Sequence, residues 1–192
     1  IGEGIPVKYI SPVNEPFWVW NGGQEGCHYR PSSCRKVLRA FVKELDSRKA
    51  LDGVRLSGCE NGDIRWFNKS YSRAVLGDPL VRTRLGALDI HSYCLHMPIP
   101  FFNNRMSFLK RFAKWMSKNY PDVPVNMSEW THMQGGRDKG MDSALVTANV
   151  MYEDLSVLNV ISWQHWIAVS EVNYCDGLIY INLDDKTFEM TK

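Results

Sequence analysis

Several common functional signatures are missing from this sequence of 192 residues. No GxGxxG or GxxxxGK loop follows any expected strand, which argues against an enzyme that binds a dinucleotide or a nucleotide phosphate. No pair of cysteines has CxxC spacing and no HExxH arrangement occurs, so we expect neither a cofactor nor a metal. No apolar run approaches the roughly 18 residues that span a bilayer, so we expect no membrane partner.

The sequence also lacks a marked excess of either positive or negative charge. The 23 basic and 21 acidic residues give a net charge of +2 and form no block of like charges, which argues against a nucleic-acid partner. The cysteine count of five is odd, so at least one thiol has no partner within the chain. Cys27 and Cys34 are close enough in sequence to bridge in an oxidising compartment; the alternative is that all five are small buried hydrophobes.

What the sequence does contain is a regular alternation of short apolar runs and longer amphipathic stretches. The runs are rich in β-branched residues, and the stretches repeat apolar side chains at helical spacing. This order is typical of repeated βα units around a parallel sheet. The expected strands cover 7–13, 54–59, 87–93, 123–127 and 160–166, and the expected helices cover 37–45, 67–76, 108–116 and 145–155.

Polar or aromatic residues follow nearly every expected strand. Barrel enzymes place their chemistry at the carboxyl ends of many strands, whereas a doubly wound sheet concentrates it at one switch point. The pattern therefore favours a (β/α)8 barrel. The residues concerned are Asn14, Glu15, Glu60, Asn61, His91, Tyr93, Ser128, Glu129, Trp130, Gln164 and Trp166.

The chain offers five of the eight strands that a barrel needs. Residues 176–190 have instead the pattern of a hairpin with an Asp-Asp-Lys turn. We therefore predict an α/β chain with the C-terminal part of a (β/α)8 TIM barrel, strands four to eight, at 1–170. The start of a β-rich side domain, a β-sandwich, is expected at 171–192.

The missing strands and a signal peptide are expected upstream of Ile1, because the first residues lack an initiator Met and a secretory leader. We interpret the chain as part of a longer protein that is secreted. A five-strand arc exposes two unpaired edges, so we expect the isolated chain to be poorly stable and almost inactive.

Two glutamates, Glu15 and Glu129, each follow an expected strand. Hydrolysis of a glycosidic bond with retention needs two carboxyl groups about 5 to 5.5 Å apart. In a barrel, strand ends from opposing walls face one bowl, so distance in sequence is no obstacle. Asn14, beside Glu15, could donate a hydrogen bond to a sugar 2-hydroxyl.

The motif Ser-Pro-Val-Asn-Glu-Pro at 11–16, the following Trp18, Trp20 and 24–27, and Met-Ser-Glu-Trp at 127–130 resemble glycoside hydrolase family 30. This family belongs to a clan of retaining (β/α)8 glycosidases. The resemblance covers essentially the whole chain. It implies that Glu15 is the general acid/base on strand four and Glu129 the nucleophile on strand seven. It also implies that Trp163, at the end of strand eight, floors the subsite of the reacting sugar.

Further residues near the strand ends are candidates for substrate binding, because exposed indoles stack on pyranose rings. Tyr93 could hydrogen-bond the Glu129 carboxylate and hold it ionised, and His91 shares its strand face. Glu60 either contacts substrate or pairs with Arg65. The expected substrate-binding residues are Asn14, Trp18, Trp20, Glu60, His91, Tyr93, Trp130, Trp163 and Trp166.

The resulting hypothesis is a retaining glycoside hydrolase that cleaves β-glycosidic bonds in a polysaccharide or oligosaccharide by double displacement. Segment 24–27 resembles that of members acting on β-1,6-galactan; β-1,6-glucan and glucuronoxylan are the alternatives. A second class is a catalytically inactive carbohydrate-binding fragment, although binding alone does not require two opposed carboxyl groups. We expect the full-length protein to be a monomer.

Overall fold

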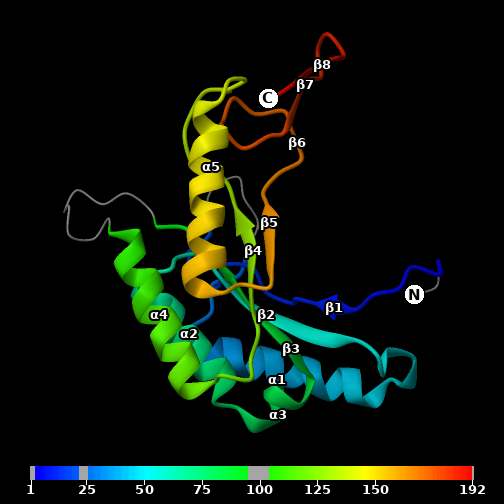
Figure 1. The fold of residues 1–192 in the computed structure, drawn as a ribbon. Helices are drawn as coiled ribbons and strands as arrows, with labels where there is room; N and C mark the ends of the chain where they lie inside the picture. The colour runs from blue at the N-terminus through cyan, green and yellow to red at the C-terminus, as the bar shows by residue number, and fades with distance from the viewer. Residues whose placement is uncertain (1–2, 22–25, 95–103, 192) are drawn as a thin grey trace.

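The computed structural model describes residues 3–21, 26–94 and 104–191. In these residues a five-stranded parallel sheet carries helices and leads into a small three-stranded sheet (Figure 1). The large sheet consists of β1 (Tyr9–Ile10), β2 (Arg55–Asn61), β3 (Leu85–His91), β4 (Val125–Trp130) and β5 (Ser162–His165). The helices are α1 (Pro31–Ser47), η1 (Lys49–Leu51), α2 (Trp66–Leu76), α3 (Pro79–Arg84), α4 (Arg105–Asn119), α5 (Asp142–Glu153) and η3 (Asp154–Leu158).

The order of the strands in the large sheet is β1-β2-β3-β4-β5, and every neighbouring pair is parallel. Because βα crossovers are right-handed, strands added in one direction place all their helices on the same side of the sheet. The sheet then curls into an arc with an inner face. A doubly wound sheet would reverse its order at a switch point. The structure is therefore a parallel, curled half-barrel, as the sequence pattern favoured.

All five expected strands and all four expected helices are present, with shifted ends. The first strand is much shorter than expected, because only Tyr9 and Ile10 pair with β2. Helix α3 was not foreseen. Its signal is an Asp-Pro pair, since Asp78 caps the helix by accepting hydrogen bonds from the Leu80 and Val81 backbone N–H groups at 3.0 and 3.3 Å.

Helices α1 and α4 hold the outer face of the arc through one apolar side each. In α1, Leu38 and Val42 are fully buried against β2 and α2, and Pro31 sits in the first turn, where its missing N–H costs nothing. In α4, Leu109 and Phe112 join the larger core beneath β3 and β4. The Asn104 side chain begins α4 by accepting a hydrogen bond from the Ser107 backbone N–H at 3.0 Å.

The second sheet consists of β6 (Val169–Ser170), β7 (Ile179–Asn182) and β8 (Thr187–Met190). Strands β7 and β8 form the antiparallel hairpin that the 176–190 pattern predicts. Asp185 stabilises its turn by accepting a hydrogen bond from the Thr187 backbone N–H at 3.0 Å. The sheet begins at Val169, close to the expected boundary at 171, and the division into two domains remains a prediction.

The cysteines are all free, so the disulfide between Cys27 and Cys34 does not form. Cys34 points from α1 into the core, whereas Cys27 is exposed. The alternative was also only partly right: Cys34, Cys59 and Cys175 are buried, Cys94 is partly buried and Cys27 is not. Among the described residues, no helix has the length and apolar character needed to cross a membrane.

Packing of α4 against the sheet predicts a local difference in stability. Leu109 is fully buried in the core, and its neighbour Lys110 is exposed. We expect Leu109→Ala to lower the free energy of unfolding of the protein by about 2–5 kcal/mol, because it leaves a cavity. The matched Lys110→Ala should change it by less than about 0.5 kcal/mol in urea unfolding. Equal effects of the two substitutions would contradict this packing.

Candidate active site

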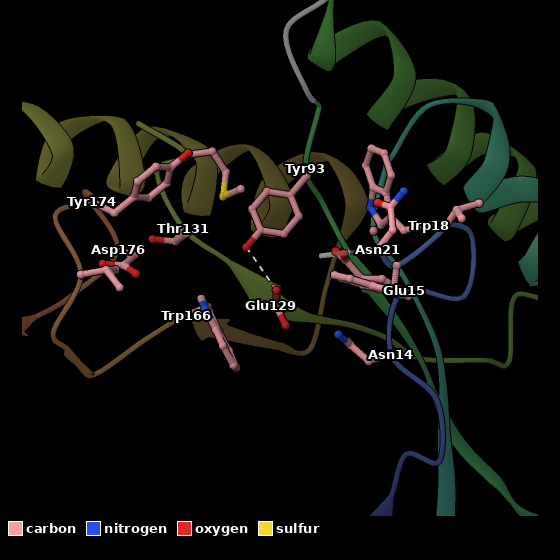
Figure 2. A pocket seen from close by; sticks show the side chains of 15 residues that line it. Asn14, Glu15, Trp18, Asn21, Tyr93, Glu129, Thr131, Trp166, Tyr174 and Asp176 are labelled. Carbon is pink, nitrogen blue, oxygen red and sulfur yellow. Dashed lines mark hydrogen bonds between the residues drawn. The ribbon is translucent and has the colours of Figure 1, made fainter. Parts of the chain in front are cut away.

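A cavity of about 500 Å³ opens at the carboxyl ends of the parallel strands. Figure 2 shows it from close by, with Glu15 and Glu129 facing one another across the same hollow. The residues that line it come from β4 itself, from the segments that follow β1, β2, β4, β5 and β6, and from Tyr93 beyond β3. They are Asn14, Glu15, Trp18, Val19, Trp20, Asn21, Gly62, Tyr93, Glu129, Thr131, Met133, Trp166, Val172, Tyr174 and Asp176.

Glu15 enters the cavity from an unusual backbone conformation. Its φ is 38°, in the left-handed region that side chains other than glycine seldom adopt. The conformation is held on both sides, because its N–H donates to the Glu60 carbonyl at 2.8 Å and its carbonyl accepts from the Trp18 N–H at 3.0 Å. Strained residues of this kind cluster at functional sites. Here the strain turns a carboxyl that is only 8% exposed into the cavity.

Gly62 makes room for that carboxyl. A Cβ built on Gly62 would lie 2.4 Å from Glu15 Oε1, 2.6 Å from its Cδ and 3.0 Å from the Trp18 indole nitrogen. These distances are closer than real Cβ contacts. The glycine at this position therefore permits the observed orientation of Glu15.

Glu129 is the fifth residue of β4 and pairs in register with His91 of β3. The Tyr93 hydroxyl donates to Glu129 Oε1 at 3.3 Å, which is the hydrogen bond expected from the sequence (Figure 2). One oxygen of Glu15, one of Glu129 and one nitrogen of His91 all lie within 4.8 Å of one another. Two carboxylates that are remote in the sequence thus meet at one point.

His91 sits between the carboxylates and is almost completely buried. Its Nδ1 lies 2.8 Å from Glu15 Oε1 and 3.7 Å from Glu129 Oε1, and its Nε2 lies 3.2 Å from Glu60 Oε2. Burial alone would lower the pKa of His91. The hydrogen bonds to Glu15 and Glu60 and the charge of Glu129 outweigh burial and raise this pKa to about 9. At neutral pH the ring is charged, and both nitrogens donate.

Glu60 and Ser128 continue the hydrogen-bond network beyond His91: Glu60 accepts from His91 Nε2, and Ser128 donates to Glu60. The register between β2 and β3 shifts at Glu60, whose φ is 53°, and the register between β3 and β4 shifts at Ser128. Such bulges re-aim side chains near active sites. Here they bring the Ser128 hydroxyl into a short hydrogen bond with Glu60. Burial opposes ionisation of Glu60, but the bonds from His91 and Ser128 hold its pKa below the ordinary value.

The pKa of Glu129 is raised, in contrast to that of Glu60. Burial is the largest cause, and the negative charges of Glu15 and Glu60 act in the same direction. The charge of His91 and the hydrogen bond from Tyr93 oppose the rise. Glu129 therefore becomes protonated at a higher pH than an ordinary carboxyl does.

Seven of the eleven residues expected to act in the site line the cavity. They are the two glutamates, Glu15 and Glu129, together with Asn14, Trp18, Trp20, Tyr93 and Trp166. The remaining four, Glu60, His91, Trp130 and Trp163, lie behind this wall. Glu60 does not pair with Arg65 as considered above, because Arg65 binds Asp63 through Nε at 2.7 Å and Nη2 at 2.5 Å.

Trp163 differs from its expected place as the floor of the site. Its indole N–H donates to the buried Asp154 Oδ2 at 3.0 Å, and its ring packs against Trp130 with centroids 6.1 Å apart. The side chain that reaches the cavity from this part of the chain is Trp166, which is 48% exposed. Its peptide bond to Ile167 is cis.

Sequence reasoning missed the cavity wall formed by Thr131, Tyr174 and Asp176. Thr131 could have been found, because it follows β4 two residues after Glu129. Tyr174 and Asp176 lie beyond the last strand of the barrel, in a segment without a periodic pattern. The isolated bridge between Gly135 and Tyr174 brings that segment to the cavity.

Glu15, His91 and Glu129 together could offer three ligand atoms to a cation. The hydrogen bonds of His91 argue against this use. A charged imidazole carries a proton on each nitrogen and has no lone pair for a metal. Metal binding would require loss of that proton and of the contact with Glu15.

One family model matches part of the chain. The family model for O-glycosyl hydrolase family 30 matches residues 90–180, which include Tyr93, Glu129, Trp166 and Asp176 but not Glu15. No curated protein matches the sequence. The match over 90–180, together with the structural likenesses below, supports a relation to this family and to the glycosidases.

Three solved structures have the same fold. A conserved exported protein from Bacteroides fragilis has a TM-score of 0.77 and 20% identity, covering 99% of this chain and 44% of its own. The catalytic domain of GH30 xylanase C from Talaromyces cellulolyticus has a TM-score of 0.68 and 13% identity, covering 99% and 40%. An endo-β1,6-glucanase has a TM-score of 0.66 and 15% identity, covering 98% and 42%. The chain thus spans about two fifths of the length of these proteins.

The close contact at Gly62 predicts an effect on stability. We expect Gly62→Ala to lower the free energy of unfolding by about 1–3 kcal/mol, because the new Cβ forces the Glu15 carboxyl or the Trp18 indole to move. The matched control is Gly53→Ala, whose new Cβ would meet no atom within 4 Å. Equal stability of the Gly62→Ala variant and the unsubstituted protein in urea unfolding would contradict the close contact.

The charge of His91 predicts a pH-dependent contribution to stability. A pKa raised from 6.5 to about 9 contributes on the order of 3 kcal/mol, fully present below pH 6.5 and lost as the pH rises through 9. We therefore expect the difference in free energy of unfolding between wild type and His91→Gln to shrink over this interval. Denaturant titrations at several pH values measure it. A difference that stays constant would mean that His91 is neutral.

Proposed function

We propose that this chain carries the catalytic half of a retaining glycoside hydrolase, with Glu15 as general acid/base and Glu129 as nucleophile. The observation that supports this most directly is the approach of their carboxylate oxygens to within 4.8 Å. Retaining enzymes hold two carboxyl groups about 5 to 5.5 Å apart, whereas inverting enzymes need about 6.5 to 9.5 Å to admit a water molecule. The short separation favours retention.

In the first step, a Glu129 oxygen attacks the anomeric carbon while the bond to the leaving oxygen breaks. Glu15 transfers its proton to that oxygen. Because Oε1 of Glu15 accepts the hydrogen bond from His91 Nδ1, we assign the transferred proton to Oε2. Tyr93 and His91 stabilise the negative charge of Glu129 before the attack.

In the second step, the ionised Glu15 takes a proton from water, and the water oxygen attacks the anomeric carbon. The bond between that carbon and Glu129 breaks, which restores the carboxylate. Two inversions at the same carbon give retention. Charged His91 is a positioning residue in both steps, because its Nδ1 lies 2.8 Å from Glu15 Oε1 and 3.7 Å from Glu129 Oε1 and so holds the two carboxyl groups near each other.

The substrate that we propose is a neutral β-linked polysaccharide, with β-1,6-galactan preferred and β-1,6-glucan as the alternative. The described residues that line the cavity include three carboxylates, Glu15, Glu129 and Asp176, and no lysine or arginine. An acidic sugar would be repelled there, most strongly by Asp176, because His91 offsets part of the charge of Glu15 and Glu129 and Asp176 has no such partner among the described residues. This argues against glucuronoxylan, which the sequence left open.

An inactive carbohydrate-binding fragment remains the contrasting class. It does not account for the left-handed Glu15 and the crowded Gly62, which constrain a carboxyl more tightly than sugar binding requires. We also propose that the full-length protein is secreted and monomeric and needs no cofactor. The isolated chain is expected to be almost inactive, since β1 and β5 leave both edges of the arc unpaired within the described residues.

Azide rescue tests the two roles separately. In the full-length protein we expect Glu129→Ala and Glu15→Ala each to lower kcat by at least about 1,000-fold on an aryl β-glycoside of the preferred sugar. Azide should restore Glu129→Ala with a glycosyl azide of inverted configuration. It should restore Glu15→Ala with a product of retained configuration, because Glu129 still forms the covalent intermediate.

The control is Glu44→Gln, a change at an exposed glutamate of α1 whose carboxylate, among the described residues, pairs with Arg48 just after the end of that helix. It should leave kcat and KM unchanged. Full activity of Glu129→Ala, or the same azide product from both variants, would remove the proposed assignment. Proton NMR of the products reads the configuration directly.

A further inference from the structure

Three buried polar atoms of residues that line the cavity have no hydrogen-bond partner among the described residues. They are Trp20 Nε1, Thr131 Oγ1 and Asp176 Oδ1, of which the last two lie together on one side of the cavity (Figure 2). Thr131 is 2% exposed and Asp176 is 8% exposed. A buried polar group without a partner costs stability, about 1–3 kcal/mol for a neutral group and more for a charged one. Such groups in a native structure call for an explanation.

The backbone around Asp176 is firmly held, so an accidental orientation of this side chain is not the explanation. The Asp176 carbonyl accepts from the Ile167 N–H at 2.8 Å and from His165 Nε2 at 3.0 Å. The preceding Cys175 N–H donates to the Gln134 carbonyl at 2.8 Å. The Tyr180 hydroxyl donates to the Tyr174 carbonyl at 2.6 Å. A fixed backbone thus presents a carboxylate that no described residue engages.

The position of this pair relative to the glutamates identifies which part of a substrate it would meet. Along the arc the order is Glu15 after β1, Glu129 on β4, and Trp166 after β5. In Figure 2, Thr131 and Asp176 lie beyond Glu129 on the side away from Glu15. Glu15 faces the leaving oxygen, so the opposite side holds the glycone, the sugar that is transferred to Glu129.

We propose that Asp176 and Thr131 form a glycone-side subsite that hydrogen-bonds the hydroxyl groups of a neutral sugar, with the exposed indole of Trp166 beside them. The inference rests on the proposed function and adds the residues that select the sugar. A carboxylate accepts from two hydroxyls at once, and a threonine hydroxyl both donates and accepts. A sugar that lacks the matching hydroxyl would leave both groups unpaired and be rejected. A sugar carboxylate would be repelled.

Two substitutions in the full-length protein test the subsite. We expect Asp176→Asn to lower kcat/KM on β-1,6-galacto-oligosaccharides by about 10- to 100-fold, since hydrogen bonds to charged groups are the strong ones. Thr131→Val, which removes only the hydroxyl, should lower it by about 3- to 10-fold. The control is Asp184→Asn, at an exposed aspartate in the turn between β7 and β8.

Thermal stability separates this role from a structural one. Because the two polar atoms lack partners, we expect Asp176→Asn and Thr131→Val to leave the melting temperature unchanged or to raise it. A residue that holds the fold together would lower it. An aryl β-1,6-galactobioside with a good leaving group tests the glycone assignment, since hydrolysis of the glycosyl-enzyme then limits kcat. If the subsite is on the glycone side, Asp176→Asn and Thr131→Val lower this kcat. If it is on the leaving-group side, they leave this kcat unchanged.

Binding in a Glu129→Gln background makes the result independent of turnover. Quenching of tryptophan fluorescence by β-1,6-galactotetraose should weaken about tenfold or more when Asp176→Asn is added. If kcat/KM and binding stay within twofold of the parent in both variants, while Glu129→Ala is inactive, the subsite is wrong and the hydrolase stands. If wild type fails to hydrolyse every β-glycan offered, the proposed function fails, and the binding measurement still decides the subsite.

Discussion

The site depends on one buried cation, the imidazolium of His91, and on the carboxylates that surround it. Without that charge, Glu60 and Glu129 would repel each other in a region from which most water is excluded, and Glu15 would join them whenever it is ionised. With it, each ring nitrogen of His91 has an acceptor, and the two glutamates that face the cavity both lie close to Nδ1. Because Glu60 is the acceptor on Nε2, it fixes the ring without contacting the cavity. A glutamate that acts through another residue is as necessary to this arrangement as the pair that faces the hollow.

The fold makes this convergence possible through its strand order. Five parallel strands added in sequence place each carboxyl end at the same rim, so β1, β3 and β4 deliver Glu15, His91 and Glu129 to one level. Two departures from regular pairing then adjust the aim. The shifts in register at Glu60 and Ser128 turn these two side chains toward each other and toward His91. A sheet with perfect alternation would have sent one of them to the helical face.

These departures also explain what the sequence could and could not predict. Strand ends that carry Glu15, His91, Tyr93 and Glu129 follow from apolar runs bounded by polar residues, and they indicated both the barrel-like arc and the hydrogen bond from Tyr93. A period of two cannot anticipate a bulge, so Glu60 was expected to contact substrate or Arg65 instead of His91. Trp163 and Trp166 are alike in sequence, and the tertiary contacts of Trp163 with the buried Asp154 and with Trp130 keep its indole out of the cavity. The contribution of Asp176 depends on tertiary contacts with 134–136, which leave no local pattern.

The cavity combines two kinds of electrostatic environment, and the difference between them gives a physical reason for their separate roles. Around Glu15 and Glu129, His91 and Tyr93 supply fixed hydrogen-bond donors, which in the proposed hydrolysis would stabilise the charge of the transition state. Around Asp176, the protein supplies backbone rigidity but no donor to the carboxylate among its described residues. A group left unpaired in this way gains most from a partner that brings hydroxyls and no negative charge. In this proposal, recognition and bond cleavage use neighbouring but chemically distinct walls of one hollow, and the preference for a neutral sugar follows from the second wall.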